Sequence, residues 1–374
     1  MSSEIPPYRQ RAGAVTIREL TAGLIWPELF RVLGLSVHPA RVLMGTLTAL
    51  VLFGGAWLIQ RASDSAGFAA LNIIWPTGGP MAVQERFDHI GARWIYSGDT
   101  WGVIGAVVWC AIVLVIGGGA VARSAALDFA VDLDPGFRKS VRFAFARLGM
   151  LLGAALIPLA VIGALVGLAK LFGLATMTWS PGDAIGGILW FIPMGLSVIA
   201  AIVGALYVFG FVMLPGAAAC EDTDSGDAIQ RVFAYLVSKP HRYVAYGVVL
   251  LAQLAIAYWL IQLVVRSGLG VAEDLAAGDF ASWGTGAQLD APPFAARAVA
   301  FWIQVAWLIF IGWVMSYLFS GGALLYLLMR RACDEQDIRE VRLTPVTLPE
   351  KRKPAGDPAT APPASGDGEA ASAS

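Results

Sequence analysis

Charged residues are scarce in this chain: only 14% of its 374 residues are Asp, Glu, Lys or Arg, whereas 57% are hydrophobic. Water-soluble domains carry about 25% charged residues. This deficit excludes a water-soluble fold before any pattern is considered. The formal net charge of −1 gives no electrostatic basis for binding nucleic acid, so we expect no nucleic-acid partner.

Cysteine and histidine are also rare, with three of each. Cys110, Cys220 and Cys333 lie far apart and show no CxxC spacing, which argues against a disulfide framework. The histidines are equally isolated, whereas a zinc site is usually recognised by closely spaced ligands. We therefore expect no metal site and no cofactor.

Catalytic motifs are missing as well. The sequence contains no Walker, zinc-protease, serine-hydrolase or dinucleotide-binding motif. An intramembrane protease would need a serine–histidine pair or paired aspartates inside its spans, and the apolar runs described next contain neither. We predict that the chain is not an enzyme and has no catalytic residues.

Six apolar runs are long enough to cross a bilayer, which takes about 20 residues per helix. Hydrocarbon offers no partners to backbone polar groups, so these runs predict helices. None of them contains Asp, Glu, Lys, Arg or His. The expected fold class is all-α, a polytopic transmembrane bundle over residues 42–329, with spans 42–59, 101–122, 148–169, 186–213, 244–265 and 298–329.

The segments outside this bundle have a different composition. In the predicted cytoplasmic N-terminal segment 1–41, the apolar stretch 20–37 is broken by Pro27, Glu28 and Arg31, which is typical of an interfacial helix. Residues 330–374 form a predicted cytoplasmic tail. From about residue 344 the tail is rich in Ala, Pro, Gly and Ser and is predicted to be disordered, because it cannot bury enough apolar surface to fold.

Basic residues give the expected orientation. With the N-terminus inside, 20 of the 26 Lys and Arg residues fall in inner segments. This asymmetry predicts that both termini are cytoplasmic and that the membrane is the cell (inner) membrane. An aromatic belt near the outer boundary agrees, formed by Trp57, Trp94, Trp101, Trp179, Trp190, Trp259 and Trp302.

Two short cytoplasmic amphipathic helices, 137–147 and 227–238, suggest an internal repeat. Each has apolar residues at helical spacing and follows a span that ends in small residues and then an acidic stretch. Spans two and three with their loop therefore match spans four and five with theirs, as in a parallel repeat. Spans six and one could form a third, split copy. The competing explanation is chance similarity between alanine-rich helix ends.

The second of these helices begins Asp-Ala-Ile-Gln-Arg at residues 227–231, and residues 136–140 read Gly-Phe-Arg-Lys-Ser. This layout resembles bacterial six-helix integral membrane domains of the kind attached to some glycerophosphodiester phosphodiesterases, and related families. Those domains carry a short cytoplasmic helix of the form Asp-Ala-hydrophobic-x-Arg between paired spans. Because no phosphodiesterase catalytic domain is present, the resemblance implies a six-helix fold and no activity.

Basic residues at the predicted cytoplasmic surface are candidate contacts for anionic lipid headgroups. A positive charge near such a surface contributes about 1 kcal/mol to attraction. The candidates are Arg138, Lys139, Arg142, Arg147, Lys239 and Arg242.

Polar and kinking residues inside the spans are candidates for a pathway or for helix packing. Gln253 and Gln304 could line a solute pathway, but hydrogen bonding between helices is the simpler interpretation. Pro158 and Pro193 lie within spans and could kink them or mark a discontinuous helix.

Two further segments, one on the predicted outer side and one on the predicted inner side of the membrane, each allow a functional and a simpler interpretation. The outer loop 61–100 could cover a binding site, but a segment resting at the headgroups explains its Trp and Pro content. The acidic cluster 221–224 with Asp227 could bind a divalent cation through its carboxylates. It lacks the order of an EF-hand, so a solvated helix-capping loop is the simpler interpretation.

These features favour a non-enzymatic scaffold, subunit or assembly factor at the inner face of the membrane. Its expected partners are the lipid bilayer and another membrane or cytoplasmic protein. The first alternative is a small-solute permease or channel, which requires a polar cavity at mid-membrane. The second is a lipid-handling protein, which requires a lateral opening beside the basic cytoplasmic helices.

Overall fold

The structure is a computed structural model of the chain and describes residues 26–63, 100–221, 224–277, 293–338 and 341. Throughout these ranges the regular secondary structure is helical. Six helices are long and apolar enough to cross a membrane, so the chain is an all-α, multi-pass membrane protein. The candidate spans are Pro39–Ala62, Thr100–Val131, Leu148–Thr176, Phe191–Gly210, Pro240–Gly268 and Phe301–Asp334.

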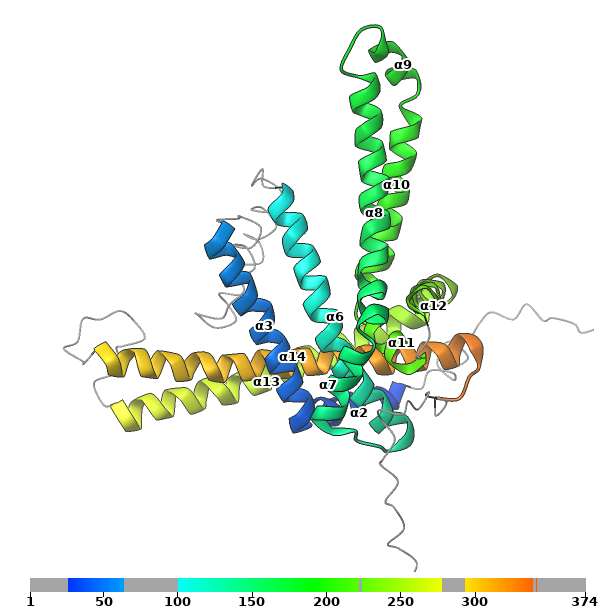
Figure 1. The fold of residues 1–374 in the computed structure, drawn as a ribbon. Coiled ribbons are helices and arrows are strands. Elements are labelled where there is room, and N and C mark those ends of the chain that lie inside the picture. The colour runs from blue at the N-terminus through cyan, green and yellow to red at the C-terminus, as the bar shows by residue number, and fades with distance from the viewer. Residues whose placement is uncertain (1–25, 64–99, 222–223, 278–292, 339–340, 342–374) are drawn as a thin grey trace, which may run out of the picture.

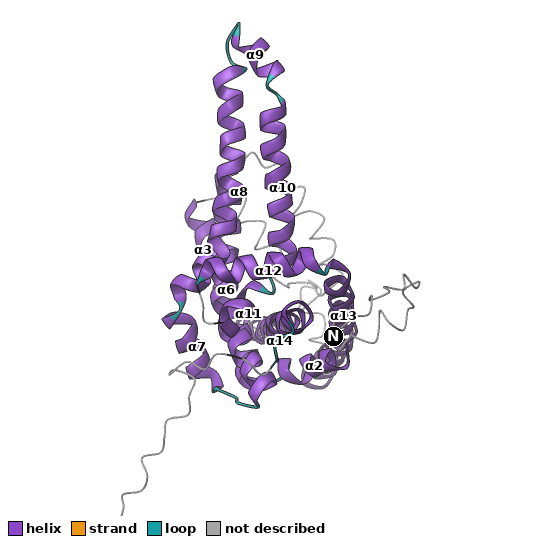
Figure 2. Cartoon of the chain, turned by 90° about the vertical axis from the view of Figure 1, so that its right-hand side faces the viewer, coloured by secondary structure: helices purple, strands orange, loops and turns teal. Residues whose placement is uncertain are grey.

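The six long helices form three neighbouring pairs. They are α3 (Pro39–Ser63) with α6 (Thr100–Val131), α8 (Leu148–Thr176) with α10 (Phe191–Gly210), and α13 (Pro240–Ala277) with α14 (Pro293–Asp334). The pairs run in different directions from a common group of short helices, which we call the base. The α8–α10 pair stands away from the rest, and the α13–α14 pair runs across the direction of α8–α10 (Figure 1). Figure 2 shows the same separation from the side.

Short helices build the base. These are η1 (Trp26–Phe30), α2 (Arg31–Ser36), α7 (Gly136–Ala146), α11 (Leu214–Glu221) and α12 (Ser225–Ser238), while α9 (Gly182–Ile188) lies at the far end of the α8–α10 pair (Figure 1). The order α6–α7–α8 recurs as α11–α12–α13, a long or buried helix followed by an amphipathic helix and a span. Helix α14, near the end of the described chain, packs against α2 and α3 near its beginning.

The amphipathic helices begin where the sequence predicts them. The backbone N–H of Gly136 donates to Asp134 Oδ1 at 3.1 Å, and Gly136 has φ +69°, a left-handed conformation that a residue without Cβ adopts at little cost. Asp224 accepts from the N–H of Ser225 at 2.8 Å and caps α12. The break before the next span falls at Lys239, because Pro240 has no backbone N–H and begins α13.

Helix α14 is the centre of the core. In its most apolar stretch, two thirds (67%) of the residues are buried inside the protein, against 6% in the corresponding stretch of α13, so α13 presents most of its surface outward. Close approach to α3 depends on glycine: a Cβ on Gly45 would lie 2.1 Å from the Gly312 carbonyl oxygen of α14. The hydroxyl of Tyr317 also donates to the Leu250 carbonyl of α13 at 2.9 Å. These contacts join α3 and α13 to α14.

Several boundaries differ from those expected. The fourth span does not run through 186–213: the chain breaks between α9 and α10, and α10 ends at Gly210. Pro193 therefore lies in the first turn of a helix, where its missing N–H costs little, and not in a helix interior. Pro158 is inside α8, as expected. The second and sixth helices continue past 122 and 329 to include charged residues.

The ends and the outer boundary complete the comparison. Of the stretch 20–37, the structure describes residues 26–37, where the short helices η1 and α2 bury Leu29 and Val32 against α13 and α14. The loop 64–99 and the tail from residue 342 lie outside the described residues. The described belt tryptophans are all exposed, as contact with lipid requires, namely Trp57, Trp101, Trp179, Trp190, Trp259 and Trp302.

Candidate functional site: buried charges and an apolar groove at the base

Helices α6, α11 and α14 pack against one another at the base, and each carries a glycine–alanine pair. The pairs are Gly119-Ala120 in α6, Gly216-Ala217 in α11 and Gly322-Ala323 in α14. A Cβ on Gly216 would lie 2.8 Å from Ala323 Cα, so α11 and α14 cross with their backbones almost in contact. The fourth residue after each glycine is buried at this meeting point, namely Arg123, Cys220 and Tyr326.

The carboxylate of Glu221 holds this meeting point together. Its Oε1 accepts hydrogen bonds from Arg330 Nη1 and from the Tyr326 hydroxyl, each at 2.8 Å, and Arg231 Nη1 lies 3.4 Å away. Burial alone would raise the pKa of Glu221, but the hydrogen bonds from Arg330 and Tyr326 outweigh it and hold that pKa below its usual value. Glu221 is therefore ionised at neutral pH.

Arg123 and Cys220 lie beside Glu221, Tyr326 and Arg330, and together these five buried side chains form what we call the central cluster. Arg123 is fully buried, donates from Nη1 to the Ala219 carbonyl at 2.5 Å, and lies over the Phe143 ring at 4.8 Å. Cys220 is equally buried, and burial raises the pKa of its thiol to about 12. A thiol of that pKa is neutral and poorly reactive, so the cluster offers no nucleophile.

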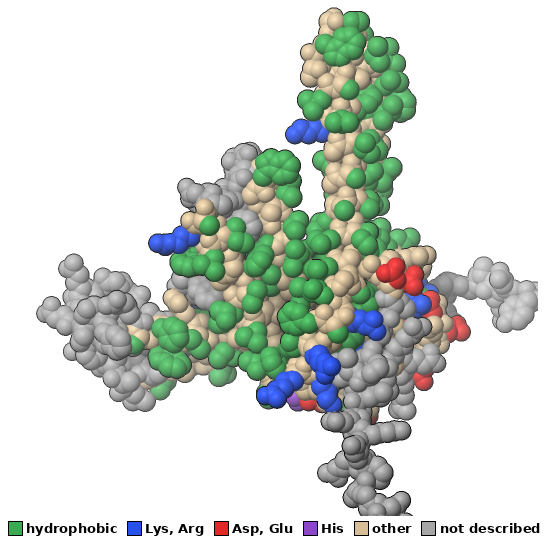
Figure 3. Space-filling view, viewed as in Figure 1, with side chains coloured by type: hydrophobic (Ala, Val, Ile, Leu, Met, Phe, Trp, Pro, Cys, Tyr) green, Lys and Arg blue, Asp and Glu red, His purple; other side chains and the backbone are tan. Residues whose placement is uncertain are grey.

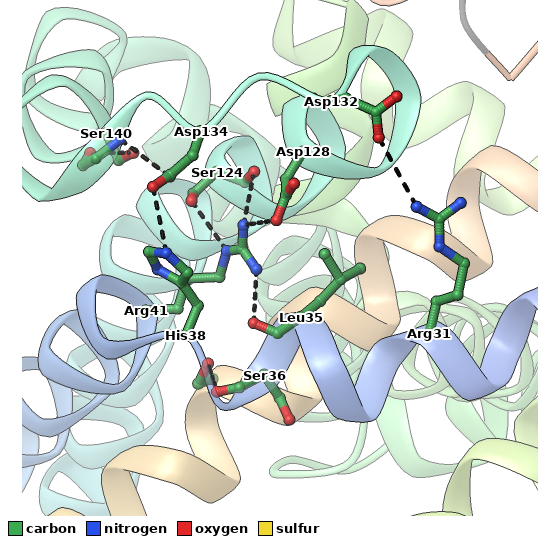
Figure 4. A network of polar contacts seen from close by, with 12 residues as sticks. Arg31, Leu35, Ser36, His38, Arg41, Ser124, Asp128, Asp132, Asp134 and Ser140 are labelled. Carbon is green, nitrogen blue, oxygen red and sulfur yellow. Dashed lines mark hydrogen bonds and ion pairs between the residues drawn. The ribbon is translucent and has the colours of Figure 1, made fainter.

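A second buried arginine joins α2, α3 and α6 (Figure 4). Arg41 is fully buried and donates to Asp128 Oδ2 at 2.5 Å, to Ser124 Oγ at 3.0 Å and to the Leu35 carbonyl at 2.6 Å. Beside it, His38 Nε2 lies 3.3 Å from Asp134 Oδ2. These contacts pair the charge of Arg41 with groups on α2 and α6, and they hold the start of α3 against the end of α6.

An apolar groove of about 360 Å³ lies between α3, α6 and α7. Its polar group, the Thr48 hydroxyl, already donates to the Met44 carbonyl at 2.8 Å. The groove opens outward, because the lining side chains Leu47, Val51 and Phe145 are each at least 41% exposed. Small residues of α6 and α7, namely Gly117, Ala120 and Ala144, also line it.

Of the six basic residues that are candidates for lipid headgroup contact, four are exposed and two are not. Arg138, Lys139, Arg142 and Arg147 are exposed on or just after α7, and on the face drawn in Figure 3 basic side chains gather at the base. Lys239 behaves differently: its ammonium donates to the Ala332 carbonyl of α14. Arg242 is partly buried in the first turn of α13.

The polar candidates inside the spans do not converge. Gln253 is buried, and its Oε1 lies 3.0 Å from the Tyr317 hydroxyl, which shares its one proton between this oxygen and the Leu250 carbonyl. Its Nε2 donates to the Phe30 carbonyl at 3.4 Å. Gln304 is exposed on α14. Pro158 and Pro193 are buried in α8 and α10, whereas the two glutamines lie on α13 and α14. The four residues therefore do not form one site.

The acidic cluster is not the solvated loop that we expected. Glu221 is buried and paired with Arg330, Asp224 caps α12 as predicted, and Asp227 is exposed. Residues 222–223 lie outside the described part of the chain. Within the described part, no group of three or more His, Cys, Asp or Glu side chains could hold a metal ion.

Sequence reasoning missed the buried arginines Arg41, Arg123 and Arg330. Each directly adjoins a predicted apolar run, because a hydropathy pattern places the boundary of a span at a charged residue. The available signal was the run of small residues before Arg123, Gly-Gly-Gly-Ala-Val-Ala, which allows close packing around a charge. Comparison with known proteins finds no match among protein families, curated proteins or solved structures. The resemblance to six-helix membrane domains stays a prediction.

Proposed function

We propose that the chain is a non-enzymatic scaffold of the cell (inner) membrane, with both termini in the cytoplasm and the base at the cytoplasmic surface. The observation that carries this proposal is the central cluster. Its buried ionisable groups bind one another, as Glu221 binds Arg330, and so serve to hold helices together. A transport site would instead direct such groups into a water-filled passage.

Two further observations support a structural role over solute transport. Gln253 is engaged by Tyr317 and the Phe30 carbonyl, and Gln304 faces outward, so the polar residues expected in a pathway do not meet. The centre of the base is filled by small and apolar side chains that are fully buried, including Ala217, Ala323 and Leu324. A dry centre favours the scaffold over the permease.

The groove favours a second candidate, a lipid-handling role. It is the kind of lateral apolar opening that such a role requires, and it lies beside the basic helix α7. A scaffold that also binds lipid combines both observations, because lipid contact and partner contact use different parts of the base.

The test of the scaffold is co-purification from native membranes in mild detergent, with bound proteins identified and quantified by mass spectrometry. A variant changes the exposed face of α12, Asp227→Ala with Gln230→Ala, and a matched control changes exposed residues after α8, Thr178→Ala with Ser180→Ala. We expect a stoichiometric partner with the wild type and the control, and its loss with the α12 variant. A partner-free protein that releases entrapped solutes from proteoliposomes would replace the scaffold with the permease.

A further inference from the structure

We infer that the groove between α3, α6 and α7 binds one acyl chain of an anionic phospholipid, whose headgroup is held by Arg138 and Arg142. The inference deepens the lipid-handling part of the proposed function, and it requires that the base lies at the membrane surface. It adds a defined site, an occupant and a headgroup charge.

The groove has the chemistry of an acyl-chain site. Its lining is apolar from α3 through α6 to α7, and its hydroxyl is already bonded within α3. Water would find no partners in such a space, whereas a hydrocarbon chain needs none. The volume of about 360 Å³ falls within the range of roughly 300–1,000 Å³ in which proteins bind small ligands.

Helix geometry places the charges at the edge of this groove. Phe137, Val141 and Phe145 line the groove and follow one another at four-residue spacing, so they form one stripe along α7. Arg138 and Arg142 have the same spacing and each follows a stripe residue directly, so they form the adjacent stripe. The opposite flank is occupied by Phe143 and Ser140, which are buried in the protein.

These arginines are available to a ligand. Among the described residues, no acidic side chain pairs with Arg138 or Arg142, and the nearby carboxylate of Asp134 lies beside His38. A guanidinium can donate two parallel hydrogen bonds to a phosphate, which makes arginine well suited to a phospholipid headgroup. The exposed Lys139 adds to the positive charge of the same helix.

A second copy of the chain is a poorer occupant than a lipid. In a two-fold symmetric dimer the same surface patch meets itself. Contact through this groove would bring Arg138 and Arg142 of both copies together, and like charges at an interface oppose association. A phospholipid supplies the opposite charge and the apolar chain in one molecule.

The experiment measures lipid binding to the purified full-length protein by native mass spectrometry. The probes are phosphatidylglycerol and phosphatidylethanolamine with identical acyl chains, so that only headgroup charge differs. The charge variant is Arg138→Gln with Arg142→Gln, and its control is Lys170→Gln with Arg266→Gln, which removes two exposed charges from α8 and α13. The groove variant is Leu47→Trp, and its control is Leu43→Trp, an exposed residue of α3 that does not line the groove.

We expect the wild type and both controls to prefer phosphatidylglycerol. The charge variant should bind phosphatidylglycerol about thirty-fold more weakly, as expected for two charges at a headgroup, and should lose less affinity for phosphatidylethanolamine, whose ammonium offsets the charge of its phosphate. Leu47→Trp should weaken both lipids, because it fills the groove. Continued protection of the Cys220 thiol from alkylation identifies the variants as folded, since this residue is fully buried.

Equal binding of the two lipids by the wild type would overturn the inference, as would a Leu47→Trp variant that binds like its control. Either result leaves the scaffold test unaffected, because that test depends on α12 and not on α7. Conversely, loss of the protein partner without loss of lipid binding would overturn the scaffold and leave the lipid site.

Discussion

The substitution Glu221→Gln tests whether the buried ion pair stabilises the base. Glutamine keeps the shape of the side chain but removes the negative charge that faces Arg330, which is 1% exposed. Breaking a buried ion pair costs about 3–5 kcal/mol, because one charge is left uncompensated. Arg330 Nη2 still donates to the Asp337 carbonyl at 3.1 Å, so we expect about 3 kcal/mol, at the lower end of that range.

The assay uses the neighbouring thiol of Cys220 in a background with Cys110→Ala and Cys333→Ala. Cys220 is fully buried and its pKa is about 12, so alkylation requires local opening of the base. When closing is fast, the alkylation rate follows the population of the open state. A loss of about 3 kcal/mol should therefore accelerate alkylation on the order of a hundredfold.

Asp227→Asn is the matched control, because Asp227 is an exposed acid of α12 and the change in charge is the same. Surface substitutions of this kind change stability by about 0.5 kcal/mol or less, so its alkylation rate should stay within about threefold of the wild type. If Glu221→Gln also alkylates at the wild-type rate, the ion pair does not stabilise the base.

The remaining predictions concern stability in mild detergent, measured as the midpoint of thermal unfolding. The pKa of Glu221 is lowered on folding, so its contribution to stability is complete above the unfolded pKa of about 4.3 and is lost as the pH falls through the lower folded pKa. The unfolding midpoint should therefore stay constant between pH 8 and pH 5. A midpoint that already falls above pH 6 would contradict this. Gly45→Ala should cost about 2–3 kcal/mol because its Cβ meets a backbone carbonyl of α14, whereas Gly54→Ala, with no atom within 4 Å, should be neutral or stabilising; equal midpoints would refute the close approach. Arg41→Ala should cost about 3 kcal/mol. Arg31→Ala, which loses exposed pairs with Glu28 and Asp132 and a cation–π contact with Phe129, should cost about 1 kcal/mol or less; a larger effect of Arg31→Ala than of Arg41→Ala would reverse the assigned roles.

The helices were predictable because their signals are local. A run of apolar residues forms a helix in hydrocarbon whatever its neighbours are, and six such runs gave the six long helices. Amphipathic spacing likewise predicted α7 and α12, and the stripe of Phe137 and Val141 does face the groove. Pro193, which the sequence places inside the fourth span, lies in the first turn of α10, just after the break between α9 and α10.

The buried charges could not be predicted in the same way. Hydropathy counts Arg123 and Arg330 as the ends of spans, because an isolated charge is costly inside a membrane protein. Their burial depends on partners supplied by other helices: Arg330 is paired by Glu221, more than a hundred residues earlier in the chain. Glu221 was assigned to a solvated loop for the same reason, since its partners are invisible in its own neighbourhood.

The six membrane helices and the amphipathic helices between them follow from the sequence, because apolar length and helical spacing are properties of each segment. The contacts between helices do not follow from it: Arg41 and Glu221 join helices, Gln253 and Gln304 do not meet, and α3, α6 and α7 leave an apolar groove beside Arg138 and Arg142. Ion pairing and cavity shape depend on which distant segments come into contact, and the packing of the whole chain decides those contacts.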